Sequence, residues 1–183
     1  SAKLPSKDDS ELAADQTYRF TGKWTTEGGQ LASALRATRN YTFYPEIVQS
    51  NVHDFATDEK FFNITSSGVL SPNVPLSGKI TIPNTVNGIQ VKTISGFTCT
   101  PVATTILDGN VGAYDCEGNG AKVTGIYFLE GNTVTKIADE AFTNCYRLVT
   151  FEWPSNLESI GVEAFASCYS LESSDLTNAS KLK

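Results

Sequence analysis

The chain has 183 residues, of which 40% are hydrophobic and 19% are charged, a balance typical of a globular protein and not of a disordered one. Its 14 basic and 20 acidic residues give a net charge of -6 without any basic cluster longer than a pair. This excludes an ordinary nucleic-acid-binding surface, because phosphates require a concentrated positive footprint. No apolar run approaches the roughly 18 residues that a membrane span requires, so we expect no transmembrane segment.

The start of the chain is typical of a processed protein or of a segment excised from a longer one. The chain begins at Ser1 and contains no Met, so we expect that any signal peptide or lipid anchor has been removed. Residues 1–16 combine Lys, Asp and Glu with small side chains, which predicts a solvated leader or tether. We interpret its charges as a solubility feature rather than as a binding site.

Residues 17–75 are globular in composition but do not repeat, and we interpret them as an N-terminal capping region. The alternation of Tyr18 and Phe20 predicts a strand, and the Leu spacing within residues 30–38 predicts a short amphipathic helix. Apolar runs on either side of a Ser-Ser-Gly turn predict a strand pair within residues 61–70. The expected role is to cover the open apolar face of the first repeat, and the alternative is a separate binding module.

The C-terminal part of the chain repeats itself, with a shift of 23 positions from Ile137 to Ile160. Six positions of one copy recur with the same residue types in the next, namely Ile137, Ala141, Phe142, Cys145, Tyr146 and Leu148, which recur as Ile160, Ala164, Phe165, Cys168, Tyr169 and Leu171. A fixed period of this length predicts a solenoid, in which each unit buries its apolar side against the next.

Within one unit the apolar spacing changes from that of a helix to that of a strand. The apolar positions from Ile137 to Cys145 fall at i, i+4, i+5 and i+8, on one face of a helix. Phe151 and Trp153 then alternate with polar residues, which predicts a short strand that Pro154 ends because it donates no ladder hydrogen bond. The predicted fold class is an α/β solenoid of short strands and short helices, preceded by a non-repeat N-terminal cap.

The pattern extends in both directions and predicts an array over residues 76–183. Ile126 to Phe128 occupy the strand position of an earlier unit, and Ile80 to Pro83 repeat the strand with its Pro ending. Residues 100–122 interrupt the pattern and are predicted to be an insertion.

The four cysteines include no Cys-x-x-Cys pair, so their spacing does not support a zinc site. Cys145 and Cys168 share one position of the repeat and are expected to be buried free thiols. Cys99 and Cys116 flank the insertion and are the candidate disulfide if the protein is exported.

Motifs for metal or catalytic chemistry are weak. Residues 115–120 imitate the first half of a calcium loop, but the twelfth position is Ile126, where a bidentate Glu is required. The one histidine, His53, stands beside Asp54 in a polar stretch, and the sequence has neither a Gly-x-Ser-x-Gly elbow nor a Gly-rich phosphate loop. We therefore expect no enzyme, no metal and no cofactor.

Two stretches, SIGVEAFASCYSL and RLVTFEWP, carry an Ile-Gly, Ala-Phe, Cys and Leu pattern and a strand that ends in Pro. This pattern resembles the leucine-rich repeats of the BspA-like family, and LSGKITIPNTVNGIQVKTI resembles the segment that opens such arrays. Members of that family are mostly secreted or surface-anchored proteins of host-associated bacteria, with relatives in some protozoa, and are implicated in adhesion to host proteins and other cells. The resemblance therefore implies a leucine-rich repeat array, a secreted or cell-surface location, and an extracellular protein or glycan as partner.

Strand alternation indicates where such a ligand would bind. If the aromatic residues of the strand point into the core, Glu152 points outward, and the same step places Tyr127 and Asp175 outward in the neighbouring units. Thr150 lies in a second column beside them. The ligand-binding hypothesis is therefore Tyr127, Glu152, Asp175 and Thr150, on a face suited to a basic or sugar-bearing partner. The alternative is that the two carboxylates keep this face soluble and discourage edge association.

Two functions follow from these patterns. The first is a secreted or cell-surface binding and adhesion module that uses the strand face to hold a host protein, peptide or glycan. The second is a non-catalytic targeting scaffold of a larger secreted enzyme. The sequence does not name the ligand, because one repeat fold serves many ligands.

Overall fold

The computed structural model describes residues 13–26, 44–102, 115–172 and 176–183. The chain divides into two compact units, Ser1–Asn51 and Val52–Lys183. The first 12 residues of the predicted leader and the helix predicted at residues 30–38 lie outside the described residues.

The described part of the first unit is a two-stranded antiparallel sheet. β1 (Gln16–Thr25) pairs with β2 (Tyr44–Asn51), and the register shifts between Phe20 and Trp24. The rings of Phe20 and Trp24 meet edge to face with centroids 5.4 Å apart, and both side chains are exposed. The strand predicted from the alternation of Tyr18 and Phe20 is confirmed.

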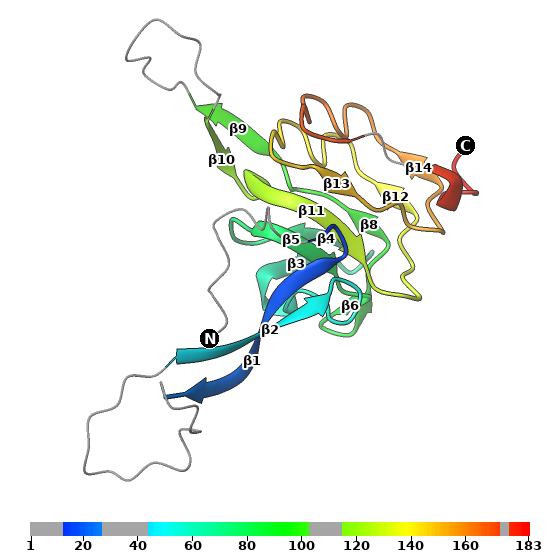
Figure 1. The fold of residues 1–183 in the computed structure, drawn as a ribbon. Helices are drawn as coiled ribbons and strands as arrows, with labels where there is room; N and C mark the ends of the chain where they lie inside the picture. The colour runs from blue at the N-terminus through cyan, green and yellow to red at the C-terminus, as the bar shows by residue number, and fades with distance from the viewer. Residues whose placement is uncertain (1–12, 27–43, 103–114, 173–175) are drawn as a thin grey trace, which may run out of the picture. The chain divides into compact units, whose positions relative to one another are not determined.

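The second unit is built from successive coils that contribute strands to two sheets (Figure 1). The first sheet has the order β13 (Thr150–Phe151), β11 (Lys122–Phe128), β5 (Ser77–Ile82). The second sheet has the order β14 (Ser159–Ile160), β12 (Lys136–Ile137), β8 (Thr93–Ile94), β4 (Val69–Pro72), β3 (Phe62–Ile64). All neighbours in both sheets pair in parallel except β3 and β4, which pair antiparallel. This is a strand-rich repeat fold.

Four short elements and one further strand pair complete the described part of this unit. The short elements are β6 (Thr85–Val86), β7 (Ile89–Gln90), and the 3-10 turns η2 (Glu59–Phe61) and η3 (Leu176–Asn178). β9 (Cys99–Val102) pairs antiparallel with β10 (Asp115–Gly118) at the two ends of the predicted insertion. The stretch that imitates a calcium loop in sequence therefore begins as strand β10.

The strand pair predicted within residues 61–70 is confirmed as β3 and β4. The turn between them has a hydrogen bond of 2.9 Å from the Gly68 N–H to the Thr65 carbonyl, and Gly68 has a φ of 84° that side-chain-bearing residues rarely adopt. Since β4 pairs with β8, this hairpin extends the second sheet and lies in the same compact unit as the repeats.

The short helix predicted over residues 137–145 does not form, and this part of the predicted fold class is wrong. Lys136–Ile137 is strand β12, and hydrogen-bonded turns follow it. Three N–H groups of these turns donate to carbonyl oxygens of the next coil, in the pairs Glu140 to Val162 (2.9 Å), Phe142 to Ala164 (2.8 Å) and Asn144 to Ala166 (2.8 Å). Donors bonded to the next coil cannot bond four residues back along their own chain. Glu140 and Asn144 also have φ values of 54° and 62°, outside the helical region.

A column of phenylalanine rings fills the core of the coils. Phe97 and Phe142 are fully buried with ring centroids 5.0 Å apart, and Phe165 continues the stack at 5.2 Å from Phe142. Phe151 meets Phe142 edge-on at 5.2 Å. Phe142 and Phe165 are therefore adjacent, as the predicted packing of each repeat unit on the next requires. Each fully buried ring contributes about 1.5–3 kcal/mol through the area it removes from water.

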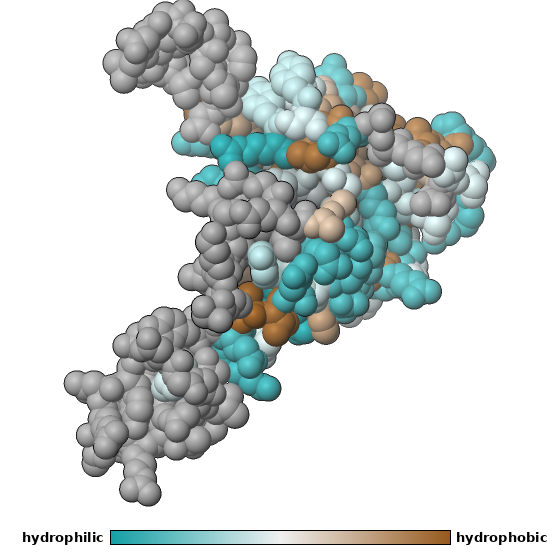
Figure 2. All heavy atoms as spheres, in the orientation of Figure 1, coloured by the Kyte–Doolittle hydropathy of each residue, from teal (hydrophilic) through white to brown (hydrophobic). Residues whose placement is uncertain are grey.

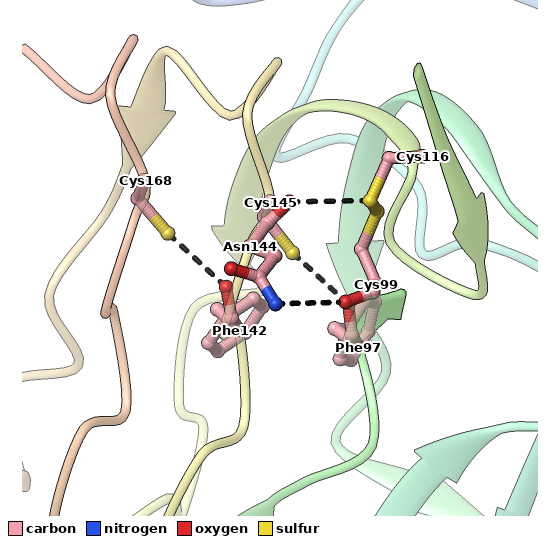
Figure 3. Close-up of a disulfide and its surroundings, with 7 residues drawn as sticks. All are labelled: Phe97, Cys99, Cys116, Phe142, Asn144, Cys145 and Cys168. Carbon is pink, nitrogen blue, oxygen red and sulfur yellow. Dashed lines mark hydrogen bonds between the residues drawn. A yellow bond between two sulfur atoms is a disulfide. The ribbon is translucent and has the colours of Figure 1, made fainter. Parts of the chain in front are cut away.

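Two cysteines of the repeat bond the coil before their own (Figure 3). The Cys145 thiol donates to the Phe97 carbonyl at 2.9 Å, and the Cys168 thiol donates to the Phe142 carbonyl at 3.1 Å. Both are free thiols. The adjacent Cys168 thiol and burial raise the pKa of Cys145, so this thiol keeps its proton and remains a donor.

Cys99 and Cys116 form a disulfide between β9 and β10, with their Cα atoms 5.8 Å apart (Figure 3). Asn144 of the next coil lies against this bridge, because its side-chain amide donates to the Cys99 carbonyl at 3.1 Å. The Asn144 carbonyl oxygen in turn lies 3.5 Å from the Cys116 sulfur. The ends of the insertion are thereby joined to each other and to the repeats.

Candidate functional site

Tyr127 is buried, so the prediction that it lies on an open strand face is wrong. Its side chain is 5% exposed and its ring covers Gly125, where a Cβ atom would lie 2.7 Å from the tyrosine ring. The His53 ring meets the Tyr127 ring at right angles with centroids 6.1 Å apart. Tyr127 therefore helps to pack the outer face of β11 and does not offer a free aromatic surface.

The cover over this face is the segment of residues 52–57. At the edge of β5, the Thr57 N–H donates to the Thr81 carbonyl at 2.9 Å, and the Thr81 N–H donates to the Thr57 hydroxyl at 3.0 Å. The Thr81 hydroxyl then donates to the Val52 carbonyl at 2.6 Å, which leaves Thr81 only 4% exposed. Strand alternation alone cannot reveal such a cover, because the covering segment lies far away in the sequence.

The other three residues of the predicted ligand column have different surroundings. Thr150 is half-buried and lies opposite Gly125 in the register of β13 and β11. Glu152 is half-buried directly after β13. Asp175 lies outside the described residues. The structure therefore leaves Glu152 as the one described carboxylate of the predicted column.

Glu152 and His53 both bind the backbone of Phe128, the last residue of β11. The Glu152 N–H donates to the Ile126 carbonyl at 2.9 Å, as in a parallel ladder. The next hydrogen bond uses the Glu152 side chain in place of a backbone carbonyl, because Oε2 accepts from the Phe128 N–H at 2.9 Å. His53 Nδ1 lies 3.0 Å from the Phe128 carbonyl oxygen and 3.8 Å from Glu152 Oε2. The two side chains thus extend the hydrogen bonding of β11 beyond the end of β13, which fixes their positions.

An open hollow of about 370 Å³ lies beside these two side chains, and we call it the Glu152 hollow. Its walls come from the chain after β11, the chain after β13 and one residue of the cover, namely Phe128, Leu129, Glu130, Gly131, Asn132, Glu152, Trp153, Pro154, Ser155 and His53. Its size falls within the range of small-ligand sites. The lining residues include two glutamates, a tryptophan and a histidine, whereas the ring of Phe128 lies in the core.

Two residues of the Glu152 hollow have buried polar atoms without a hydrogen-bond partner in the described part of the chain. They are the indole Nε1 of Trp153 and the side-chain oxygen Oδ1 of Asn132. The Asn132 side chain is held from its other end, because its amide donates to the Leu129 carbonyl at 3.3 Å. Most buried polar atoms in native proteins have a partner, so each of these atoms marks a place where a ligand or a water molecule is expected.

A second surface feature is a pair of tyrosines on successive coils, of which Tyr146 is half-buried and Tyr169 is exposed. Tyr146 and Tyr169 occupy the same position of the repeat, and their rings stack at 5.6 Å with an angle of 8° between their planes. Tyr169 is 78% exposed, whereas the parallel column of phenylalanines lies in the core. On the face shown in Figure 2, apolar residues of the described part lie in small separate groups. The tyrosine pair is therefore an aromatic surface at the outside of the repeats.

Comparison with protein families gives a match over much of the repeat region. The family described as BspA type leucine rich repeat region (6 copies) matches residues 119–182. Residues 119–182 are therefore similar to the BspA-type leucine-rich repeat. A repeat domain of this family indicates a protein-interaction module, and such domains are typically non-catalytic.

Among solved structures, the crystal structure of the T. pallidum leucine rich repeat protein TpLRR is similar to this chain, with 19% sequence identity and a TM-score of 0.44. The similarity covers 64% of this chain and 48% of the TpLRR chain, so the matched region spans about half of that protein. The comparison with curated proteins returned no match.

Within the part that the structure describes, the chain has no helix long and apolar enough to cross a membrane. The same residues contain no group of three or more His, Cys, Asp or Glu side chains arranged to hold a metal ion.

Sequence reasoning missed three residues of the Glu152 hollow, namely His53, Trp153 and Asn132. His53 stands out as the one histidine of the chain but is separated from Glu152 by almost a hundred positions, so no local pattern connects them. Trp153 was assigned to the core, and its ring does pack 4.8 Å from Phe151. Asn132 was detectable in the sequence, because Asn156 follows 24 positions later, close to the repeat length. In the structure the Asn156 side-chain amide donates to the Asn132 carbonyl at 3.1 Å. This recurrence could have identified Asn132 as a position of the repeat.

Proposed function

We propose that this chain is a secreted or cell-surface binding and adhesion module that holds an extracellular protein or glycan. The BspA-type repeat match supports the binding role, and the observation that carries the choice of surface is the stacked pair of Tyr146 and Tyr169. This surface replaces the predicted strand-face column, because Tyr127 is buried there.

The tyrosine pair has the properties of a contact surface. Tyrosine offers a large, rigid and amphipathic area at a low cost in conformational entropy, and it is enriched among residues that dominate interface energies. Stacking against Tyr146 restricts the ring of Tyr169 before any partner arrives, which reduces the entropy lost on binding. Because Tyr169 is 78% exposed, its ring is available to a protein or to the face of a sugar.

The disulfide between Cys99 and Cys116 supports a location outside the reducing cytosol, since disulfides persist in oxidising compartments. Mass spectrometry of unreduced peptides tests the pairing. We expect Cys99 linked to Cys116, with Cys145 and Cys168 recovered as free thiols after unfolding in an alkylating agent. A bridge between Cys145 and Cys168 would contradict this pairing, and recovery of all four cysteines as free thiols would remove the support for export.

The binding role is tested by screening the purified chain against immobilised extracellular-matrix proteins and a glycan array. For any hit, Tyr169→Ala should weaken binding about tenfold or more, the loss expected when a contributing aromatic anchor is truncated. Val162→Ala is the matched control, because Val162 is 71% exposed on the same coil and lies outside the tyrosine pair. Equal affinity of the wild type and the Tyr169 variant for every hit would refute this surface, and a screen without hits would refute the binding role.

A further inference from the structure

The Glu152 hollow has an acidic lining with one oxygen atom in a fixed place. Glu130 and Glu152 contribute carboxylates, and no Lys or Arg is among the ten lining residues. The Oε2 atom of Glu152 is held by the Phe128 N–H at 2.9 Å, and no donor among the described residues binds its second oxygen. An ordered carboxylate with a free oxygen favours a cationic partner, because little ordering entropy remains to be lost when the ion pair forms.

The other walls of the hollow are suited to a flat cation. Trp153 contributes an aromatic side chain that is only partly buried, and the Oδ1 atom of Asn132 is a buried acceptor without a donor in the described part of the chain. A guanidinium group has five N–H donors in one plane and no acceptor, and it stacks on aromatic rings. A lysine ammonium is more strongly hydrated and cannot stack in this way.

We propose that the Glu152 hollow binds the guanidinium group of an arginine side chain on a partner protein. This inference rests on the proposed binding role and names a second point of contact, formed by different residues from the tyrosine pair. The net charge of -6 on the whole chain favours the approach of a basic partner segment.

The indole signals of the two tryptophans allow a direct test in the intact chain. In a nitrogen-15-labelled sample, Trp153 reports on the hollow and Trp24, in the other compact unit, serves as an internal control. The Trp24→Phe variant assigns the two signals. The probes are N-acetyl-arginine amide and N-acetyl-citrulline amide, which have nearly the same shape but differ in charge. We expect the arginine probe to move the Trp153 signal in a saturable way, and the citrulline probe to leave it in place.

The variant Glu152→Gln removes the negative charge but keeps an oxygen that can accept from the Phe128 N–H. It should weaken binding of the arginine probe about fivefold or more, as expected when an ordered charge partner is neutralised. Glu158→Gln is the matched control at an exposed carboxylate outside the hollow, and it should leave binding unchanged. Glu130→Gln provides a second test if the Glu152 variant fails to fold.

Three results would overturn the proposal. They are an unmoved Trp153 signal with the arginine probe, an equal response to the citrulline probe, and a saturable response to methyl glucoside with none to arginine. The last result would assign the hollow to sugars. None of them depends on the tyrosine pair, so failure of the hollow is distinguishable from failure of the binding role.

Discussion

Replacing Phe142 with Ala should lower the free energy of unfolding of the Val52–Lys183 unit by about 3–5 kcal/mol, the range measured when a buried aromatic ring is truncated. The Phe142 side chain is 0% exposed and contacts three other rings, those of Phe97, Phe151 and Phe165, at centroid distances of 5.0, 5.2 and 5.2 Å. The substitution therefore opens a cavity between successive coils and removes all three ring contacts.

The surrounding backbone has little freedom to close this cavity. The Phe142 N–H donates to the Ala164 carbonyl at 2.8 Å, and the Phe142 carbonyl accepts from the Cys168 thiol at 3.1 Å, so bonds to the next coil hold the emptied position. We therefore expect a cost in the upper half of the range, about 4–5 kcal/mol. At about 2–4 °C per kcal/mol for a unit of this size, the midpoint of thermal unfolding should fall by about 10 °C or more.

Urea unfolding followed by the fluorescence of Trp153 measures this cost, with Trp24→Phe as background so that one tryptophan reports. Phe165→Ala is the matched control, because Phe165 occupies the same position of the next coil but is only half-buried. It should cost roughly half as much, since less apolar area leaves the core. A midpoint shift of less than about 2 °C for Phe142→Ala, or a larger loss for Phe165→Ala, would refute the proposed stacking energetics.

Two further substitutions test the bonding around the site. Glu152→Ala leaves the Phe128 N–H without its acceptor, so it should lower the free energy of unfolding in urea by about 1–3 kcal/mol. Glu152→Gln keeps an acceptor and should be nearly neutral. Equal losses of stability in the two variants would show that the hydrogen bond at 2.9 Å contributes nothing. Gly161→Ala should destabilise the unit by about 1–3 kcal/mol, because the new Cβ would overlap the backbone nitrogen of Asp139. A melting temperature equal to that of the wild type would contradict this close approach.

The repeat was predictable because the residues that recur in the sequence are the ones that contact each other in successive units. The shift from Phe142 to Phe165 predicts adjacent side chains, and these two rings stack in the structure. Tyr146 and Tyr169 share one position of the repeat and stack as well. A period in sequence becomes a contact in space when each unit packs on its copy. Such a prediction requires no knowledge of the backbone conformation inside the unit.

That conformation is where the sequence pattern failed. The apolar residues from Ile137 to Cys145 have helical spacing, but a chain of tight turns also brings them to one side. The deciding factor is the hydrogen bonding of Phe142 and its neighbours to the next coil, which depends on the stack being formed. Glu140 adopts a φ of 54° without being glycine, so no residue type marks the turn in advance.

The candidate site depends on contacts between distant segments, which explains why only part of it was predicted. Glu152 was identified from strand alternation, and it does lie at the surface. His53 was set aside as a lone histidine, although its ring lies 3.0 Å from the Phe128 carbonyl oxygen and covers Tyr127. Neither contact follows from a local pattern, because residues 52–57 are far from Tyr127 and Phe128 in the sequence and meet them only in the folded chain.

The same outward position in three successive coils shows why the hollow lies where it does. Thr81 and Tyr127 are opposite each other in the register of β5 and β11, and Glu152 follows at the corresponding place after β13. Residues 52–57 cover the first two, which are 4% and 5% exposed, whereas the side chain of Glu152 remains 35% exposed. His53 is the residue of the cover that lies next to Glu152, and beyond it this face of the repeats is open to solvent. A carboxylate at that boundary can satisfy the free N–H of Phe128 with one oxygen and still present the other to a ligand, which neither a threonine nor a tyrosine at that place could do.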